Sequence, residues 1–494
     1  MNKKRVTGCL FLWLCLLMPV CAQDFDFNTR CTAAYQAIQA LRFKEGLALI
    51  KTERANNPDN LMTDYIEDFH NFLTVYTTDT RQSYEQYRKQ RDIHLAKLAA
   101  GNPASQYYLY TQAQITLYWA ALDARFGEHL QAALGIRRAY KMLEENTHRF
   151  PQFDANKVPL GLLYALVGSI PDKYRWAVQL MGMDGDLHRG MELLRSAAFQ
   201  ADTSAPARRE ALMIYALLLI NLQNDAETAW HTLRKNGFPI KNHLLSTYLV
   251  AFAGIYGKHS AEALEIIKQR PHGAEYAQFP LLDYLHGLAL LHQLDTSAAE
   301  MFKKFLKTYT GDAHVKSAYQ KLAWCCLLRN DTTCYKNTIR QALQYGSQTL
   351  DADRQAHYEA SAGTIPHPVL LRARLLSDGA SFKRALEELQ QLNDAHLSSA
   401  EQRTEYHYRL GRIYQETREN SLALSAYAKA MEHGDKLPRY FAARSAYETG
   451  RIYEQAGNTD SAAAYYRKCL TYQEHEYKNG LDQKAKSALE RIKK

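Results

Sequence analysis

The chain has 494 residues, of which 46% are apolar, 23% charged and 11% aromatic, a composition typical of a globular protein. It contains only 24 glycines and 13 prolines among its 494 residues. This share is well below the roughly 12% that glycine and proline together contribute to an average protein. So few turn-forming residues exclude a β-sandwich, a β-propeller and a long disordered segment, and they predict a mostly helical protein. Tyrosine is unusually frequent, with 33 residues.

Residues 1–22 have the pattern of a secretory signal peptide. Three basic residues at 3–5 precede an unbroken apolar run over 10–18, and small residues precede a cut before Gln23. The apolar run is shorter than the about 20 residues that a transmembrane helix needs. We therefore expect an exported protein, periplasmic or associated peripherally with the outer membrane, with no transmembrane helix in the mature chain. Lipidation of Cys21 stays open, although Met18-Pro19-Val20 fits a lipidation site poorly.

The formal net charge is +9, and three of the positive residues lie within 1–22. No segment concentrates Lys and Arg, so we expect no nucleic-acid partner. The sequence lacks HExxH, GxSxG, GxGxxG and phosphate-loop motifs. We therefore predict a protein that is not an enzyme and takes no cofactor.

Two features resemble metal sites only superficially. His286 and His292 are six residues apart, which does not place them on one helix face. The run from Gly182 to Asp186 lacks the later ligands of a calcium loop. We interpret it as a turn between helices, with Gly185 at positive φ and Asp186 capping the next helix.

Five cysteines follow residue 22: Cys31, Cys325, Cys326, Cys334 and Cys469. In an oxidising compartment, Cys325 or Cys326 could pair with Cys334 across a short loop between helices. The interpretation that we favour is that Cys326 and Cys469 occupy small buried helix positions, as Ala does in other repeats.

A repeat appears in the C-terminal part of the chain. Gly411-Arg412-Ile413-Tyr414 recurs 39 residues later as Gly450-Arg451-Ile452-Tyr453. In both copies small residues and bulky residues follow at the offsets of a tetratricopeptide (TPR) repeat, including Tyr427 in the first and Tyr466 in the second. Gly and Ala let two antiparallel helices approach closely, and the Tyr rings fill the space beside them.

Weaker copies upstream predict that the same architecture continues. Degenerate copies of the TPR pattern occur around Ala251, Gly287, Ala323 and Ala373. Residues 43–60 have the pattern of the second helix of such a repeat and the proline that follows it. We predict an all-α superhelix of antiparallel helix pairs, with 23–199 divergent, 200–346 made of degenerate TPR repeats and 347–494 of C-terminal TPR repeats. The joints are expected at 200–206 and 347–368, neither of which has the composition of a flexible linker.

The segment from Gln131 to Ala198 resembles a particular family. Its ordered blocks are Ile136–Lys141, Pro159–Leu163, Gly168–Pro171, Leu180–Asp186 and Gly190–Leu194. They are similar to the eukaryotic tetratricopeptide repeat protein thirty-nine family, whose fungal relatives are linked to clearing lipid inclusions. The resemblance implies a helical N-terminal half joined to C-terminal TPRs and a non-enzymatic scaffold. It does not transfer a lipid role, because that family is intracellular.

The predicted binding surface is the concave groove lined by the first helix of each pair. In the last two repeats its residues include Tyr408 and Arg412, then Arg444, Tyr447 and Arg451. Tyr and Arg four residues apart share a helix face and are favoured at protein interfaces. The groove would hold an extended acidic peptide or the tail of another protein. The alternative is that Arg412 and Arg451 pair with nearby acids such as Glu448 and only stiffen the superhelix.

Two functions from different classes follow from this architecture. The first is a non-catalytic scaffold of the cell envelope that binds partners through the concave face. The second is a SusD-like outer-membrane component that binds carbohydrate, against which the poor lipidation site and the scarcity of Gly- and Pro-rich loops count.

Overall fold

The computed structural model describes residues 24–170, 175–199, 205–236, 238–393 and 396–492. Within these residues the structure is helical and forms no β-strand, only an isolated bridge between Asp24 and Asn60. The predicted all-α class is therefore confirmed. The predicted signal peptide and Cys21 lie outside the described residues. None of the described helices is long and apolar enough to cross a membrane.

The helices of the N-terminal half are α1 (Thr29–Gln39), α2 (Phe43–Asn56), α3 (Met62–Thr78), α4 (Arg81–Ala99), α5 (Gln106–Arg125), α6 (His129–Arg149), η1 (Asp154–Asn156), α7 (Lys157–Gly168), α8 (Arg175–Leu180), α9 (Leu187–Phe199), α10 (Ala205–Asn221) and α11 (Ala226–Lys235). The remaining helices are α12 (Leu244–Tyr256), α13 (Ser260–Lys268), α14 (Leu281–Leu291), α15 (Ala298–Thr308), α16 (Val315–Leu328), α17 (Thr332–Ile339), α18 (Gln341–Gln344), α19 (Asp351–Ala362), α20 (Pro368–Asp378), α21 (Phe382–Leu389), α22 (Ala400–Glu416), α23 (Asn420–Gly434), α24 (Tyr440–Gln455), α25 (Thr459–Thr471) and α26 (Lys478–Arg491).

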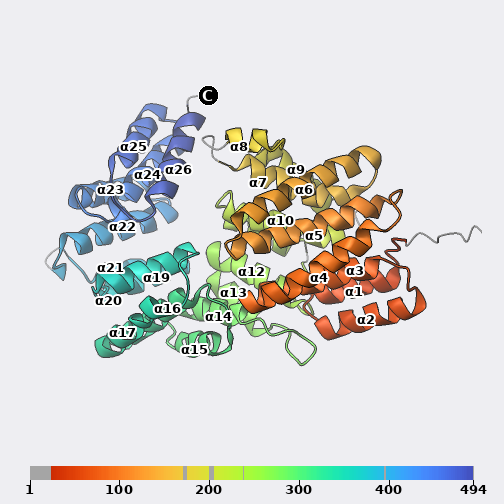
Figure 1. The fold of residues 1–494 in the computed structure, drawn as a ribbon. Helices are drawn as coiled ribbons and strands as arrows, with labels where there is room; N and C mark the ends of the chain where they lie inside the picture. Colours follow the sequence, from red (N-terminus) through yellow and green to blue (C-terminus); the bar gives the residue numbers. More distant parts are fainter. Residues whose placement is uncertain (1–23, 171–174, 200–204, 237, 394–395, 493–494) are drawn as a thin grey trace, which may run out of the picture.

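Consecutive helices pack as hairpins, and the hairpins stack into a superhelix (Figure 1). The pairs of the C-terminal half are α12/α13, α14/α15, α16/α17, α20/α21, α22/α23 and α24/α25, with α26 covering the last pair. Short polar turns connect the two helices of each hairpin, which explains why so few Gly and Pro residues suffice for a chain of this length.

The Gly and Tyr residues of the two C-terminal repeats contact each other as their spacing predicts. A Cβ atom on Gly411 would lie 2.5 Å from the Tyr427 ring, and one on Gly450 would lie 2.7 Å from the Tyr466 ring. Both Tyr side chains are fully buried. Each ring therefore takes the space that the missing side chain leaves, and this close contact fixes the first helix against the second.

Glycines also determine the contact between α7 and α9 in the middle segment. A Cβ on Gly185 would lie 2.4 Å from the backbone nitrogen of Gly168. The predicted positive φ at Gly185 is wrong, because the residue that adopts it is Gly182, at +64°. Asp186 does cap α9, since its carboxylate accepts the N–H of Arg189 at 2.9 Å. Gly185 is required for close approach rather than for backbone conformation.

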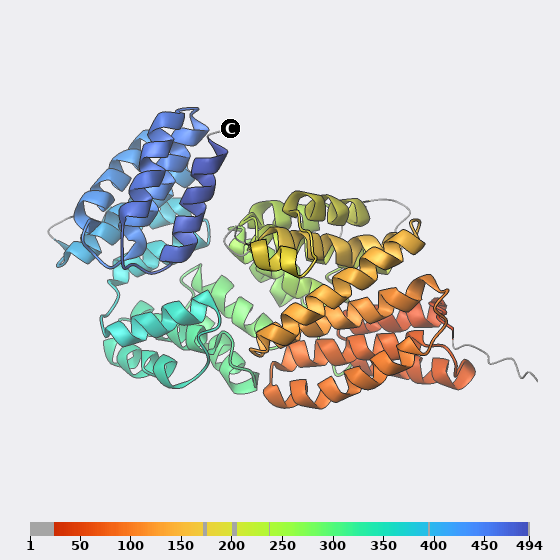
Figure 2. The same ribbon diagram turned by 45° about the horizontal axis from the view of Figure 1, so that its top comes forward.

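The superhelix curls so that its N-terminal hairpins pack against later ones. Tyr35 of α1 and Tyr118 of α5 both donate to Glu210 of α10, at 2.9 Å each. At the other end of the chain, Lys484 of α26 donates to Asn224, in the turn between α10 and α11, at 3.2 Å. Figure 2 shows the C-terminal helices opposite α7–α11 across this turn of the superhelix.

The predicted joint at 347–368 contains a helix instead. Helix α19 packs against α16, and its buried Asp353 accepts N–H groups of His314 at 2.7 Å and Ser317 at 2.9 Å. Asp353 therefore caps α16 from a distant part of the chain. Much of the other predicted joint, 200–206, lies outside the described residues.

One disulfide links Cys326 to Cys334 between α16 and α17. The favoured interpretation of Cys326 as a plain small core residue is therefore wrong. Cys326 and Cys334 face each other across the hairpin because their helices pack in antiparallel fashion. Cys469 is a free buried cysteine, as expected, and so are Cys31 and Cys325.

Candidate functional site

Three adjoining hollows lie between the middle and the C-terminal hairpins. Their volumes are about 150, 310 and 150 Å³, and all three are lined by Arg374. Most of the lining residues belong to first helices of the hairpins, α12, α14, α16, α20, α22 and α24, which form the concave side of such a superhelix. We call the surface formed by these three hollows the concave groove.

One position of the repeat contributes a lining residue to the groove from each of four hairpins. The residue that follows the small residue of each first helix is Leu288, Trp324, Arg374 and Arg412 in successive hairpins, and each of these lines a hollow. The predicted groove residues came from the last two repeats alone and did not include Trp324 or Arg374. The frames around Ala323 and Ala373 carried the signal needed to find them.

Trp324 organises the centre of the groove. Its indole N–H donates to Glu359 of α19 at 2.8 Å. The ammonium nitrogen of Lys321 lies 4.2 Å from the ring centroid, and the guanidinium carbon of Arg374 lies 4.8 Å from it. Two cations are thus held beside one aromatic ring, a cation–π arrangement that fixes their positions.

Lys321 is the most unusual charge in the groove. Its side chain is 8% exposed, and its ammonium group donates to Gln320 at 2.6 Å. Burial, reinforced by the positive charge of Arg374, lowers the pKa of Lys321 to about 7, although Glu359, Asp378 and Asp353 oppose the shift. Among the described residues no carboxylate forms an ion pair with Lys321.

Apolar side chains line the hollow beside Lys321. Ile255, Leu288, Leu291 and Leu375 contribute aliphatic surface. Burial lowers the pKa of His292 in the same hollow, and its Nδ1 lies 2.8 Å from the Ser260 hydroxyl. This half of the groove therefore combines an apolar wall with a cationic centre.

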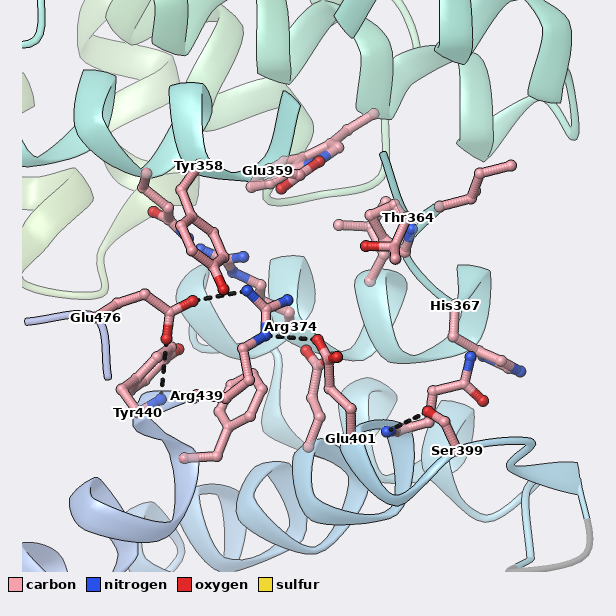
Figure 3. Close-up of a pocket in the computed structure, with 18 of the residues that line it drawn as sticks. Tyr358, Glu359, Thr364, His367, Arg374, Ser399, Glu401, Arg439, Tyr440 and Glu476 are labelled. Atoms are coloured by element: carbon pink, nitrogen blue, oxygen red, sulfur yellow. Dashed lines mark hydrogen bonds and ion pairs between the residues drawn. The ribbon is translucent and has the colours of Figure 1, made fainter. Parts of the chain in front are cut away.

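In the opposite half of the groove the central cation is paired with acids. Figure 3 shows Arg439 between Glu476 and Glu401, to which it donates at 2.7 and 2.5 Å. Glu476 also accepts the N–H of Tyr440 at 3.0 Å. Arg439 is thus already paired with two acids, whereas Lys321 in the other half has no carboxylate ion-pair partner among the described residues.

The structure brings three of the predicted arginines together around one acid. Glu448 of α24 is completely buried and accepts from Arg412 at 2.9 Å, Arg444 at 2.7 Å and Arg451 at 3.0 Å. Burial would raise the pKa of Glu448, but Arg444, Arg412 and Arg451 hold it well below the ordinary carboxyl value. We call this arrangement the Glu448 cluster. It shows that the ion pairing considered as the alternative does form.

The predicted tyrosines lie in different environments. Tyr408 lines the hollow that Arg412 also lines, but it is only 6% exposed and packs against Tyr427 and Phe441, so little of its ring is accessible. It is drawn inward because α23 and α24 cover it from both sides. Tyr447 is half-buried, and the guanidinium of Arg444 lies 5.3 Å from its ring centroid.

No protein family matches the sequence. No curated protein is similar to it either. Solved structures that the chain is similar to include human IFIT1 dimer with m7Gppp-AAAA (12% identity, TM-score 0.28, covering 90% of this chain and 82% of IFIT1). Two others are the P58(IPK) TPR domain (12%, 0.22, covering 87% and 97%) and a Rap protein complexed with competence and sporulation factor (11%, 0.25, covering 93% and 98%).

Proposed function

We propose that this protein is a non-catalytic scaffold that binds an extended segment of a partner protein in its concave groove. The segment would present a carboxylate to Lys321 and Arg374 and an apolar side chain to the wall beside them. The observation that carries the proposal is the position of these two cations on Trp324, inside a hollow of about 310 Å³ on the concave side.

Charge compensation supports an anionic ligand. Lys321 has no carboxylate partner among the described residues, and the acid paired with Arg374 is Asp378, 3.7 Å away and half exposed. An ionised carboxylate placed between the two cations would form charge-assisted hydrogen bonds in a site largely shielded from water. The apolar wall would then favour a ligand with an aliphatic or aromatic residue next to the acid.

Exchanging Arg374 for glutamine tests the proposal. We expect R374Q to weaken binding of a fluorescein-labelled peptide of alternating Glu and Leu by about tenfold, because one charge-assisted hydrogen bond is lost. Fluorescence anisotropy gives the dissociation constant. The matched control is R384Q, an exposed residue of α21 that lines none of the three hollows. Equal affinity for the Gln/Leu version of the peptide, or an unchanged affinity of R374Q, would contradict the proposal.

The same titration has an expected pH dependence. Because the pKa of Lys321 is lowered to about 7, its positive charge is present below that pH and lost above it. Peptide affinity should therefore fall between pH 6 and 9, and K321M should remove most of this change. Burial lowers the pKa of His292 below its ordinary value, so we expect its titration at lower pH than that of Lys321.

We further propose that the chain is exported and acts in the cell envelope. The basic residues at 3–5 and the apolar run over 10–18 support this proposal. The expected result is an envelope-fraction protein whose intact mass corresponds to a chain beginning at Gln23. A mass that includes residues 1–22 in the cytosolic fraction would contradict it, and incorporation of labelled palmitate would indicate lipidation of Cys21 instead.

A further inference from the structure

Three side chains with metal-binding chemistry converge on the surface between α11 and α13. Glu227 and His231 lie one turn apart on α11, and His259 directly precedes α13. The Nε2 atom of His231 is 2.8 Å from one oxygen of Glu227, and the Nε2 atom of His259 is 2.9 Å from the other. The three donor atoms all lie within 4.8 Å of one another.

The position of His259 is held by its neighbours before any ligand binds. The ring of His259 stacks on Trp230 with centroids 4.9 Å apart. Its backbone N–H donates to the Gly254 carbonyl at 2.6 Å, which holds the turn that precedes α13. Glu227 and His231 share one face of α11 because they are four residues apart. A metal ion would therefore meet an arrangement that requires only small side-chain rotations.

The three groups are the ligand set of an open zinc site. Two imidazole nitrogens and one carboxylate oxygen bind Zn²⁺ at about 2.0–2.2 Å in tetrahedral sites whose fourth position is free. We propose that Glu227, His231 and His259 bind a zinc ion. Glu227 and His231 are 54% and 66% exposed, so the fourth position faces solvent and would hold water or a ligand from a partner.

Glu262 provides a second line of support. Its carboxylate oxygen lies 3.5 Å from Nδ1 of His259, the ring nitrogen that faces away from Glu227. With a metal ion bound to Nε2, the proton of the His259 ring is on Nδ1. From there the N–H group can donate a hydrogen bond to the Glu262 carboxylate. A carboxylate in this position orients a metal-binding histidine and increases its basicity.

A second group of potential metal ligands differs from the Glu227–His231–His259 cluster in its charge neighbours. Asp64, Glu67 and His94 also lie close together, but Lys97 and Arg54 already neutralise the carboxylates, at 2.8 Å and 2.5 Å. Among the described residues neither Lys nor Arg forms an ion pair with Glu227, whose two partners are the histidines. The negative charge of Glu227 is thus available to a cation.

Zinc titration of the tag-free full chain tests the site. By calorimetry at pH 7.5 we expect one saturable Zn²⁺ site, and Co²⁺ in its place should show the visible bands of tetrahedral coordination. H231A and E227Q should weaken binding by more than about 100-fold, and E262Q by about tenfold, the lower end of what loss of an outer-shell partner costs. H272A is the matched control, because His272 is exposed and lies outside the cluster.

Thermal unfolding gives an independent readout. Zinc should raise the melting temperature of the unaltered chain and of H272A, because binding to the folded state alone stabilises it. It should leave H231A unchanged. Both substituted ligands are exposed, so the variants are expected to fold. Absence of stoichiometric binding, or binding that H231A and E227Q leave intact, would overturn the proposal.

Discussion

Replacing Glu448 by glutamine is expected to destabilise the C-terminal hairpins by about 3–5 kcal/mol, the usual cost of removing one partner from a buried ion pair. Glu448 is completely buried and forms ion pairs with Arg412, Arg444 and Arg451, which belong to two successive hairpins. Glutamine keeps the shape of the side chain but removes the buried charge that the three guanidinium groups share, and of the three only Arg412 keeps another acid among the described residues, Glu416 at 3.4 Å. The loss should appear as a lower midpoint in urea and as faster amide hydrogen exchange in α22–α26.

The control for this prediction is E432Q, because Glu432 is an exposed residue of α23 outside the Glu448 cluster. We expect it to change stability by less than about 0.5 kcal/mol. The pKa of Glu448 is lowered in the folded state, so its stabilising contribution is present above the ordinary carboxyl pKa and is lost as pH falls toward the folded value. The difference between E448Q and the unaltered chain should therefore shrink in acid. A constant difference down to pH 3 would contradict the proposed role of the charge.

Replacing Tyr427 by alanine is expected to cost about 3–5 kcal/mol, as for other large buried aromatic residues. The Tyr427 ring is fully buried against Gly411, and its hydroxyl donates to Gln415 at 2.6 Å. Removing the ring leaves a cavity between α22 and α23 that rigid helix backbones fill poorly. Urea denaturation followed by circular dichroism measures the change.

Y345A is the matched control, since Tyr345 is 51% exposed, and it should cost less than about 1 kcal/mol. The specific role of the Gly–Tyr contact can be separated from general packing. G411A alone should destabilise by about 1–3 kcal/mol, because its Cβ would meet the Tyr427 ring. In the Y427A background the same substitution should cost little. Additive effects of the two changes would contradict the contact.

The Glu448 cluster also changes how the predicted binding residues are tested. Alanine at Arg412 or Arg451 would disturb a buried charge network, so weaker binding by such variants would reflect altered packing as well as lost contacts. Arg374 lacks this role, because its acid is an exposed neighbour on the same helix. It is therefore the better position at which to examine the groove.

Local sequence patterns predicted most of the fold. The spacing of Gly411 and Tyr427, repeated at Gly450 and Tyr466, specifies how two helices pack, and that relation is contained within one hairpin. The helix at 351–362 was not predicted, because its main structural contact is with residues far away in the sequence. Asp353 caps α16 across about one hairpin, and no signal near Asp353 in the sequence points to that partner.

The sequence by itself determined the all-α class, the hairpin unit and the line of residues that follows the small position of each first helix. These properties depend on contacts between residues less than about one repeat apart. Only the tertiary structure decided which of those residues are free to bind. Arg412 is joined to the buried acid Glu448, whereas Arg374 lies on Trp324 beside Lys321 and has only a half-exposed acid, Asp378, as its partner among the described residues. The His231–Glu227–His259 cluster likewise exists only once α11 and the start of α13 lie together. Exposure and charge compensation depend on how successive hairpins stack, and the pattern within one repeat does not contain that information.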